Sequence, residues 1–237
     1  MPITSAVVLA AGRGSRFWPY NVVRNKAAFP ISSVPAIRRT VDALVLLGIN
    51  RIVVVTGSGE ASVRAALRGA GGEVRFVRQS LQAGTADAVL HAASHIDGDL
   101  LIVSGDVVTD PANIETIVSC FDETHPMAAA LIQPLGAERP QDWLVAFPEG
   151  ETLAGVEGHP RHGKHRLCGI YAMRHAAIDC LRDDPGVMKQ VPVGGMPPLE
   201  SEIAQSLQMM IDEGMDVLAV KTNGYFVDLD KPWHILE

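Results

Sequence analysis

The sequence predicts an α/β fold, in which a Rossmann-like, mostly parallel sheet is flanked by helices and followed by a smaller mixed lobe. Two observations predict it. Apolar, β-branched runs alternate with helical patterns through the first half of the chain, and after about Met127 the pattern changes to short strands separated by turns. The alternation is typical of βαβ units, which place ligands at the carboxyl ends of their strands.

The individual elements follow from hydrophobic periodicity. In the first half, strands are expected at 5–11, 51–56, 74–78 and 100–104, and helices at 36–47, 60–69, 85–95 and 113–121. In the second half, strands are expected at 127–132, 143–147, 152–156, 167–173 and 216–221, and helices at 176–182 and 199–213. The chain shows no internal repeats and no long linker.

Composition limits the classes of function. With 237 residues, of which 47% are hydrophobic, the chain is long enough to bury a substantial core. The formal net charge of −7 argues against nucleic acid as the main partner. No apolar stretch reaches the roughly 18 residues that a membrane span needs, so neither a membrane partner nor a location outside the cytoplasm is expected. Three widely spaced cysteines indicate reduced core thiols.

A glycine-rich turn follows the first expected strand. It reads Leu-Ala-Ala-Gly-Arg-Gly-Ser-Arg-Phe from Leu9 to Phe17. Glycines at 12 and 14 permit close approach of the backbone to anionic oxygens, and Arg16 with Lys26 adds positive charge. A dinucleotide fingerprint is disfavoured because Trp18-Pro19 interrupts an immediate helix, and no Gly-Lys-Ser/Thr triplet makes a P-loop. The turn therefore predicts a polyphosphate site.

Carboxylates follow two other expected strands. Asp106 comes after an apolar run that ends at Gly105, and Asp228 closes the short run from Tyr225, with Asp230 two positions on. Aspartate at a strand end commonly caps a turn or the next helix. Two such carboxylates beside an anion-binding turn favour Mg²⁺ instead, because this ion takes hard oxygen ligands together with phosphate and water.

Four segments of the chain resemble a known family in their order and spacing. They are LAAGRGSRFWP from Leu9 with Lys26 downstream, QSLQAGTA from Gln79, SGD ending at Asp106 and FVD ending at Asp228. Together they resemble the sugar-1-phosphate nucleotidylyltransferases, such as the glucose-1-phosphate thymidylyltransferases and N-acetylglucosamine-1-phosphate uridylyltransferases. These enzymes join a nucleoside triphosphate to a sugar 1-phosphate and release pyrophosphate.

The resemblance implies the nucleotide-diphospho-sugar transferase fold as a single domain over 1–237. Within it, 1–126 would form the nucleotide-binding half, and 127–237 the acceptor-binding half with the closing strand and helix. A homo-oligomer, such as a dimer through the second half, is also an expectation.

The resemblance also implies roles for individual residues. Arg16 would face the departing pyrophosphate, and Lys26 would bridge the α-phosphate and the sugar phosphate. Asp106 and Asp228 would hold Mg²⁺. Asp230 is a further candidate ligand for this ion. The implied nucleotide-binding residues are Leu9, Ala11, Gly12, Gly14, Ser15, Arg16, Gln79, Gly84 and Thr85. A glutamine amide can pair with the imide edge of uracil or thymine, which favours UTP or dTTP.

The acceptor side departs from the family pattern. The implied acceptor-binding residues are Glu157, Gly169 and Tyr171, but Leu167 occupies the position where the family has asparagine. Because leucine cannot hydrogen-bond a hydroxyl, either another group replaces it or the acceptor differs from the common hexose 1-phosphates. The basic residues between 161 and 166 are expected to form a solvated loop.

Two alternatives stay open. The first keeps the fold but activates a non-sugar phosphorylated acceptor with CTP, which the altered acceptor strand permits. The second is a catalytically silent nucleotide-binding or regulatory subunit. Retention of Arg16, Lys26 and both aspartates argues against the second, because a protein that only binds nucleotide need not keep the metal pair and the leaving-group cation.

Overall fold

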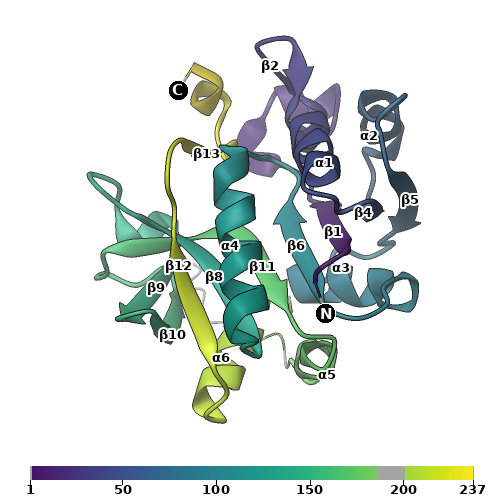
Figure 1. The fold of residues 1–237 in the computed structure, drawn as a ribbon. Coiled ribbons are helices and arrows are strands. Elements are labelled where there is room, and N and C mark those ends of the chain that lie inside the picture. Colours follow the sequence, from purple (N-terminus) through teal and green to yellow (C-terminus); the bar gives the residue numbers. More distant parts are fainter. Residues whose placement is uncertain (1, 185, 187–200, 237) are drawn as a thin grey trace.

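A single mixed sheet runs through both halves of the chain (Figure 1). The computed structural model describes residues 2–184, 186 and 201–236. Over these residues the sheet has nine strands in the order β5-β4-β1-β6-β11-β8-β12-β10-β9. Their bounds are β1 Ser5–Ala10, β4 Arg51–Thr56, β5 Glu73–Arg78, β6 Leu100–Ser104, β8 Ala128–Pro134, β9 Leu144–Glu149, β10 Thr152–Gly158, β11 His165–Met173 and β12 Val217–Lys221.

The strand directions separate the two halves. Strands β5, β4, β1 and β6 are parallel, as the alternating pattern predicts. Strand β11 then pairs antiparallel with both β6 and β8, and β10 with both β12 and β9. The α/β class is therefore confirmed. The second half extends the sheet of the first and makes it mixed.

Helices cover both faces of the sheet. They are α1 Ala36–Leu46, α2 Glu60–Ala66, α3 Thr85–Ala92, α4 Pro111–Thr124, α5 Ala177–Arg182 and α6 Ile203–Asp212. Side chains of α3, α5 and α6 share one apolar core with the sheet, whereas those of α1, α2 and α4 share the other. With both faces covered, ligands are expected at the carboxyl ends of the parallel strands.

The expected and observed boundaries differ at the ends of several elements. Helix α4 is longer than expected because Asp110 caps it, accepting a hydrogen bond from the Ala112 amide at 3.0 Å. Helix α3 passes into a 3-10 turn over Ala93–His95. Strand β11 begins at His165, earlier than expected, since a bulge at Gly169 lets it pair on both sides of the irregularity. The expected helix start at 199 lies outside the described residues.

Two short strand pairs were not expected as sheets. β2 Pro30–Ile31 pairs with β3 Val34–Pro35, and β7 Val107–Thr109 pairs antiparallel with β13 Phe226–Asp228. The second pair brings the end of the chain back to the carboxyl end of β6. In its register Asp228 lies opposite Val107, the residue after Asp106, and the Leu229 amide donates to the Asp106 carbonyl at 3.1 Å.

In the part of the chain that the structure describes, no helix is both long and apolar enough to span a bilayer.

Gly84 is expected to be intolerant of a side chain. Its φ is +105°, and a Cβ there would lie 2.2 Å from the Ser201 carbonyl oxygen, which accepts a hydrogen bond from Ala86 at 2.8 Å. We expect Gly84→Ala to lower the free energy of unfolding by about 3 kcal/mol or more, measured by urea denaturation. Gly98→Ala is the matched control, because Gly98 also has positive φ but no atom within 4 Å of the added Cβ. Equal losses in the two variants would contradict the steric explanation.

Candidate functional site

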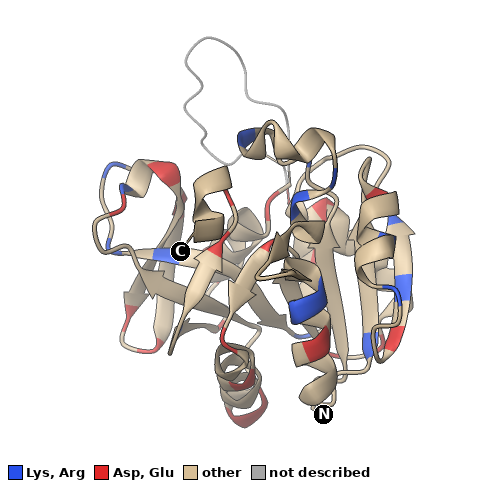
Figure 2. Ribbon diagram, turned by 90° about the horizontal axis from the view of Figure 1, so that it is seen from above, with Lys and Arg blue, Asp and Glu red and all other residues tan. Residues whose placement is uncertain are grey.

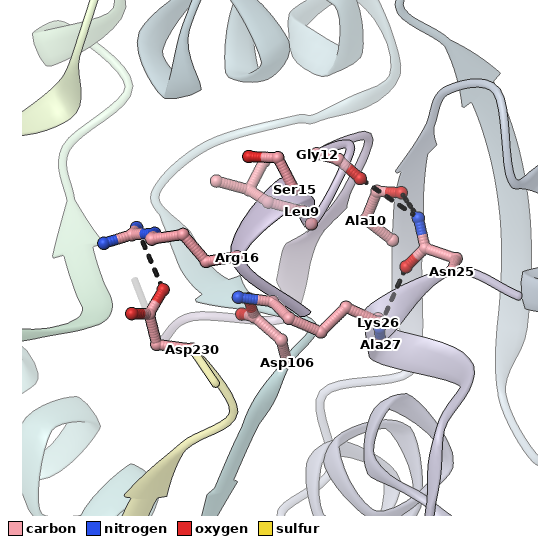
Figure 3. Close-up of a pocket in the computed structure, with 11 residues that line it drawn as sticks. Leu9, Ala10, Gly12, Ser15, Arg16, Asn25, Lys26, Ala27, Asp106 and Asp230 are labelled. Atoms are coloured by element: carbon pink, nitrogen blue, oxygen red, sulfur yellow. Dashed lines mark hydrogen bonds and ion pairs between the residues drawn. The ribbon is translucent and has the colours of Figure 1, made fainter. Parts of the chain in front are cut away.

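The glycine-rich turn lines a cavity at the carboxyl end of β1 (Figure 3). Gly14 adopts a left-handed conformation with φ of 59°, and a short 3-10 turn over Ser15–Phe17 follows it. Burial of Phe17 among Ala36, Val108 and Leu229 anchors this turn to the body of the protein. The cavity measures about 220 Å³ and is lined by Leu9, Ala10, Gly12, Gly14, Ser15, Arg16, Asn25, Lys26, Ala27, Asp106 and Asp230.

Asn25 fixes Lys26 at the floor of this cavity. Its Nδ2 donates to the Ala10 carbonyl at 2.9 Å, and its Oδ1 accepts from the Ala27 amide at 2.9 Å, which caps the 3-10 turn Lys26–Ala28 (Figure 3). The same amide group also reaches the Gly12 carbonyl at 3.4 Å. Asn25 therefore ties the lysine turn to β1 by hydrogen bonds.

Lys26 lies among acidic groups. Its Nζ is 2.5 Å from Asp106 Oδ2, and only 15% of the lysine side chain is exposed. Burial by itself lowers the pKa of Lys26, but the charges of Asp106, Asp228 and Asp230 outweigh that effect and raise it above its ordinary value. Lys26 is thus held as a cation at the carboxyl end of the sheet.

The surroundings of Asp228 disfavour its charged form, whereas those of Lys26 favour the charged form. Burial, followed by the negative charge of Asp106, raises the pKa of Asp228 to about 6, and the charge of Lys26 only partly offsets this. Two carboxylates at neighbouring backbone positions thus repel each other at neutral pH. A further cation between them would relieve that repulsion.

Arg16 forms an ion pair with Asp230, the residue named above as a further candidate ligand for Mg²⁺. Its Nη2 lies 2.9 Å from Asp230 Oδ1; Asp230 is 8% exposed, whereas the arginine side chain is 65% exposed (Figure 3). The guanidinium is therefore anchored at one side and open to solvent at the other. Such a group can bind a phosphate without losing its orientation.

A second cavity continues from the first. It measures about 340 Å³ and shares Leu9, Arg16, Lys26, Asp106 and Asp230 with its neighbour. Its remaining lining residues come mainly from the second half of the chain; they are Thr85, Ser104, Asp142, Trp143, Leu144, Gly158, His159, Leu167, Gly169, Tyr171, Glu202, Ile203 and Asp228. The four residues on which the catalytic hypothesis depends, Arg16, Lys26, Asp106 and Asp228, therefore line one continuous hollow.

Two of the three predicted acceptor-binding residues line the second cavity, and the third does not. Gly169 and Tyr171 line the second cavity, with Gly169 in a left-handed conformation that sets its backbone against the Ser104 side chain. Glu157 lies on β10 and is exposed, outside the lining, while the next residue, Gly158, is part of it. Leu167 lines the cavity, so an apolar side chain is present where the family has an amide.

The residues expected at the base lie at the start of α3. Gln79 is buried, and its Nε2 donates to the Gly84 carbonyl at 3.0 Å and to Asp87 Oδ2 at 2.7 Å. Both hydrogens of that amide nitrogen are thus engaged, and base reading by Gln79 stays a prediction. The Thr85 hydroxyl bonds Glu202 at 2.7 Å, and the neighbouring Gln82 Nε2 donates to the Ala11 carbonyl.

The carboxylates of Asp106 and Asp228 suit a metal ion that also binds water and substrate phosphates. Within 2–184, 186 and 201–236, no group of three or more histidine, cysteine or acidic side chains forms a ready-made metal site. Mg²⁺ commonly binds one or two carboxylates and completes its shell with water and substrate phosphates. Asp106 and Asp228 fit that pattern, because their mutual repulsion leaves negative charge for a cation to neutralise.

Several lining residues lie outside the motifs that the sequence analysis used. Trp143 and Glu202 fall inside a strand and a helix expected from periodicity, but the structure places them just outside those elements, and His159 lies in a turn. Periodicity indicates an element and does not mark which of its residues lines a cavity. For Asn25 a signal did exist, since an asparagine directly before a short helical run is typical of a helix cap.

The expectation of a solvated basic loop over 161–166 is wrong for its last two members. Arg161, His162 and Lys164 are exposed, but His165 and Arg166 are both in β11, His165 is half-buried and Arg166 is only 5% exposed. Pairing of β11 with β8 draws this residue into the sheet. In the view of Figure 2, basic and acidic residues are interspersed over helices and loops. The cations that face the two cavities, Arg16 and Lys26, therefore form a local feature and not part of a broad basic face.

The chain is similar to proteins that make nucleotide sugars. The bifunctional protein GlmU of Methanococcus aeolicus is 26% identical over 235 residues, which cover 98% of this chain and 53% of that protein. A glucose-1-phosphate thymidylyltransferase of Streptomyces antibioticus is 26% identical over 238 residues, covering 98% of this chain and 64% of that one. The chain thus spans between half and two thirds of the length of these relatives.

A solved structure shares the fold. A UDP-glucose pyrophosphorylase complexed with UDP-glucose superposes with a TM-score of 0.84 at 17% identity, over 99% of this chain and 96% of that one. The model of the MobA-like NTP transferase domain matches residues 6–185. These similarities confirm the resemblance that the four sequence segments indicate, and the chain belongs to the family of MobA-like NTP transferase domains.

Proposed function

We propose that this chain is a nucleotidyltransferase that moves the nucleotidyl group of UTP or dTTP to a sugar 1-phosphate, with release of pyrophosphate. One observation carries the proposal: two cations and two carboxylates, Arg16, Lys26, Asp106 and Asp228, line one continuous hollow between the glycine-rich turn and the second half of the chain. The names of the relatives support the choice of thymidylyl or uridylyl transfer and of a sugar phosphate acceptor.

In the proposed reaction, an oxygen of the sugar phosphate attacks the α-phosphorus of the triphosphate. A new P–O bond forms as the bond from that phosphorus to the bridging oxygen of pyrophosphate breaks, so no covalent enzyme intermediate is needed. The two reactants are both anions, and bringing them together is the main barrier that the protein must lower.

Each charged side chain has a part in lowering that barrier. Arg16, anchored by Asp230, would bind the departing pyrophosphate through its open side. Lys26 would exchange part of its contact with Asp106 for the α-phosphate and acceptor phosphate oxygens. Asp106 and Asp228 would hold Mg²⁺, which supplies positive charge to the reacting phosphate when it is bound. Gly12, Gly14 and Ser15 would offer backbone and hydroxyl donors to the β- and γ-phosphates.

The test is pyrophosphate release by the purified chain with Mg²⁺, using UTP, dTTP, CTP and ATP, each paired with several sugar 1-phosphates and with a phosphorylated alcohol. Release with UTP or dTTP and glucose 1-phosphate is the expected result. Release only with CTP and a phosphorylated alcohol would favour the alternative acceptor class, to which the Leu167 side chain in the second cavity is suited. No release with any pair would favour a silent binding subunit.

A further inference from the structure

Arg166 is a nearly buried cation that the proposed reaction does not use. It is 5% exposed, and it pairs in register with Gln133 of β8 and Val145 of β9. Its Nη2 donates to Gln133 Oε1 at 3.0 Å, and its Nε lies 3.3 Å from Glu138 Oε2. Its Nη1 is buried without a hydrogen-bond partner among the described residues.

The guanidinium lies against aromatic rings. Its central carbon is 3.9 Å from the centroid of the Trp143 ring and 5.4 Å from that of Phe226. Contact this close with an indole face is favourable for a planar cation, and more so when both groups are shielded from water. Arg166 also lies near the proposed metal site, because the Phe226 ring that it contacts is on β13, the strand that ends at Asp228.

Trp143 forms part of the wall of the second cavity. Its backbone is fixed on both sides: its amide donates to the Pro140 carbonyl at 3.1 Å, and its carbonyl accepts from the His159 amide at 3.0 Å. The Trp143 side chain has several staggered rotamers available, and contact with Arg166 favours the one observed.

Stability alone does not account for Arg166. Arg166 loses much of its hydration on burial, and it recovers little, because its one carboxylate partner, Glu138, is 40% exposed and its Nη1 has no hydrogen-bond partner among the described residues. The residue therefore points to a role in the neighbouring cavity.

We propose that Arg166 is a positioning residue that holds Trp143 as an aromatic wall, against which the ring of the acceptor packs. This inference rests on the proposed function. It also explains how an acceptor could be bound where Leu167 replaces a hydrogen-bonding asparagine, because the apolar face of a pyranose ring can pack on an indole and on leucine without a hydrogen bond.

The test is a double-mutant cycle with Trp143→Leu and Arg166→Met, assayed with UTP and glucose 1-phosphate. Each single variant is expected to raise the KM for glucose 1-phosphate about tenfold and to change the KM for UTP less than about twofold. If Arg166 acts through Trp143, the double variant should be no worse than Trp143→Leu. An additive effect, about a hundredfold in the acceptor KM, would overturn the proposal, and so would equal effects on both substrates.

A control variant separates positioning from folding. Arg39→Met removes another partly buried arginine, which donates to the Ile31 carbonyl at 2.7 Å and has an unpartnered Nε, yet does not line either cavity. It should leave the acceptor KM unchanged. Arg166→Met should keep the free energy of unfolding close to the wild-type value, because the Glu138 carboxylate that loses its partner is 40% exposed and can be hydrated, while the acceptor KM rises. A drop in stability that accounts for the lost activity would contradict the positioning role.

A fluorescence measurement distinguishes failure of this proposal from failure of the proposed function. The chain has three tryptophans, so Trp143 is the single indole in a Trp18→Phe, Trp233→Phe background. There, Arg166→Met should raise acrylamide quenching of Trp143 about twofold, and glucose 1-phosphate should lower it in the presence of Arg166. If the wild type releases no pyrophosphate with any pair, the function is wrong. If quenching is unchanged by both, the positioning role is wrong.

Discussion

Replacement of Lys26 by methionine is expected to lower kcat/KM by about a hundredfold or more without unfolding the protein. Lys26 is a buried cation beside the reacting phosphates in the proposed reaction, and one charge-assisted contact made in the transition state is worth on the order of 3 kcal/mol. Methionine keeps the length of the side chain and removes the charge. Initial rates of pyrophosphate release, with circular dichroism to check the fold, measure the effect.

The matched control is Lys164→Met, since Lys164 is exposed and lies outside both cavities. It should keep wild-type kinetics. A folded Lys26→Met protein with near-normal rates would remove Lys26 from the reaction, and the four-residue arrangement would then lose the cation that bridges the two substrates.

Asp228→Asn is expected to abolish most of the activity and, without metal, to stabilise the fold. The activity falls because an amide is a far weaker Mg²⁺ ligand than a carboxylate. The stability rises because burial and the charge of Asp106 raise the pKa of Asp228 to about 6 from an ordinary 3.8. A shift of that size corresponds to about 3 kcal/mol against the ionised carboxylate in the folded state.

The direction of this pKa shift determines how the free energy of unfolding depends on pH. A raised carboxyl pKa stabilises the fold only while the group is protonated, so the wild type loses this contribution as pH rises from about 4 through about 6. In EDTA, urea denaturation should show Asp228→Asn more stable than the wild type above about pH 6, and nearly equal to it below about pH 4. Excess Mg²⁺ should narrow the difference at pH 8, because it stabilises only the protein that binds it.

Asp97→Asn serves as the control for this pair of measurements. The Asp97 side chain is 87% exposed and forms a surface ion pair with Arg51, a kind of contact that contributes little to stability. Neither activity nor the pH profile should change. If Asp228→Asn were less stable than the wild type at pH 8 in EDTA, burial and the charge of Asp106 would not be the dominant effects on Asp228.

The elements of the first half were predicted well because the hydrophobic pattern of each strand and helix lies within a few neighbouring residues. The runs at 51–56 and 100–104 have the same bounds in the sequence analysis and in the structure, since continuous β-branched apolar residues mark strands that are buried on both faces. The second half was less predictable. Arg166 reads as part of a polar loop, because no local signal reveals that its backbone pairs with two other strands.

At the site, too, local sequence and tertiary structure determined different features. By its composition and motifs, the sequence determined the α/β class, the polyphosphate-binding turn and the identity of the charged side chains, because these depend on residue type and local spacing. The tertiary structure decided which of those side chains meet. Asp228 reaches Asp106 only through the pairing of β13 with β7, and Trp143 reaches Arg166 only through the sheet. Contacts between residues so far apart in the chain depend on packing of the whole fold, which no short segment encodes.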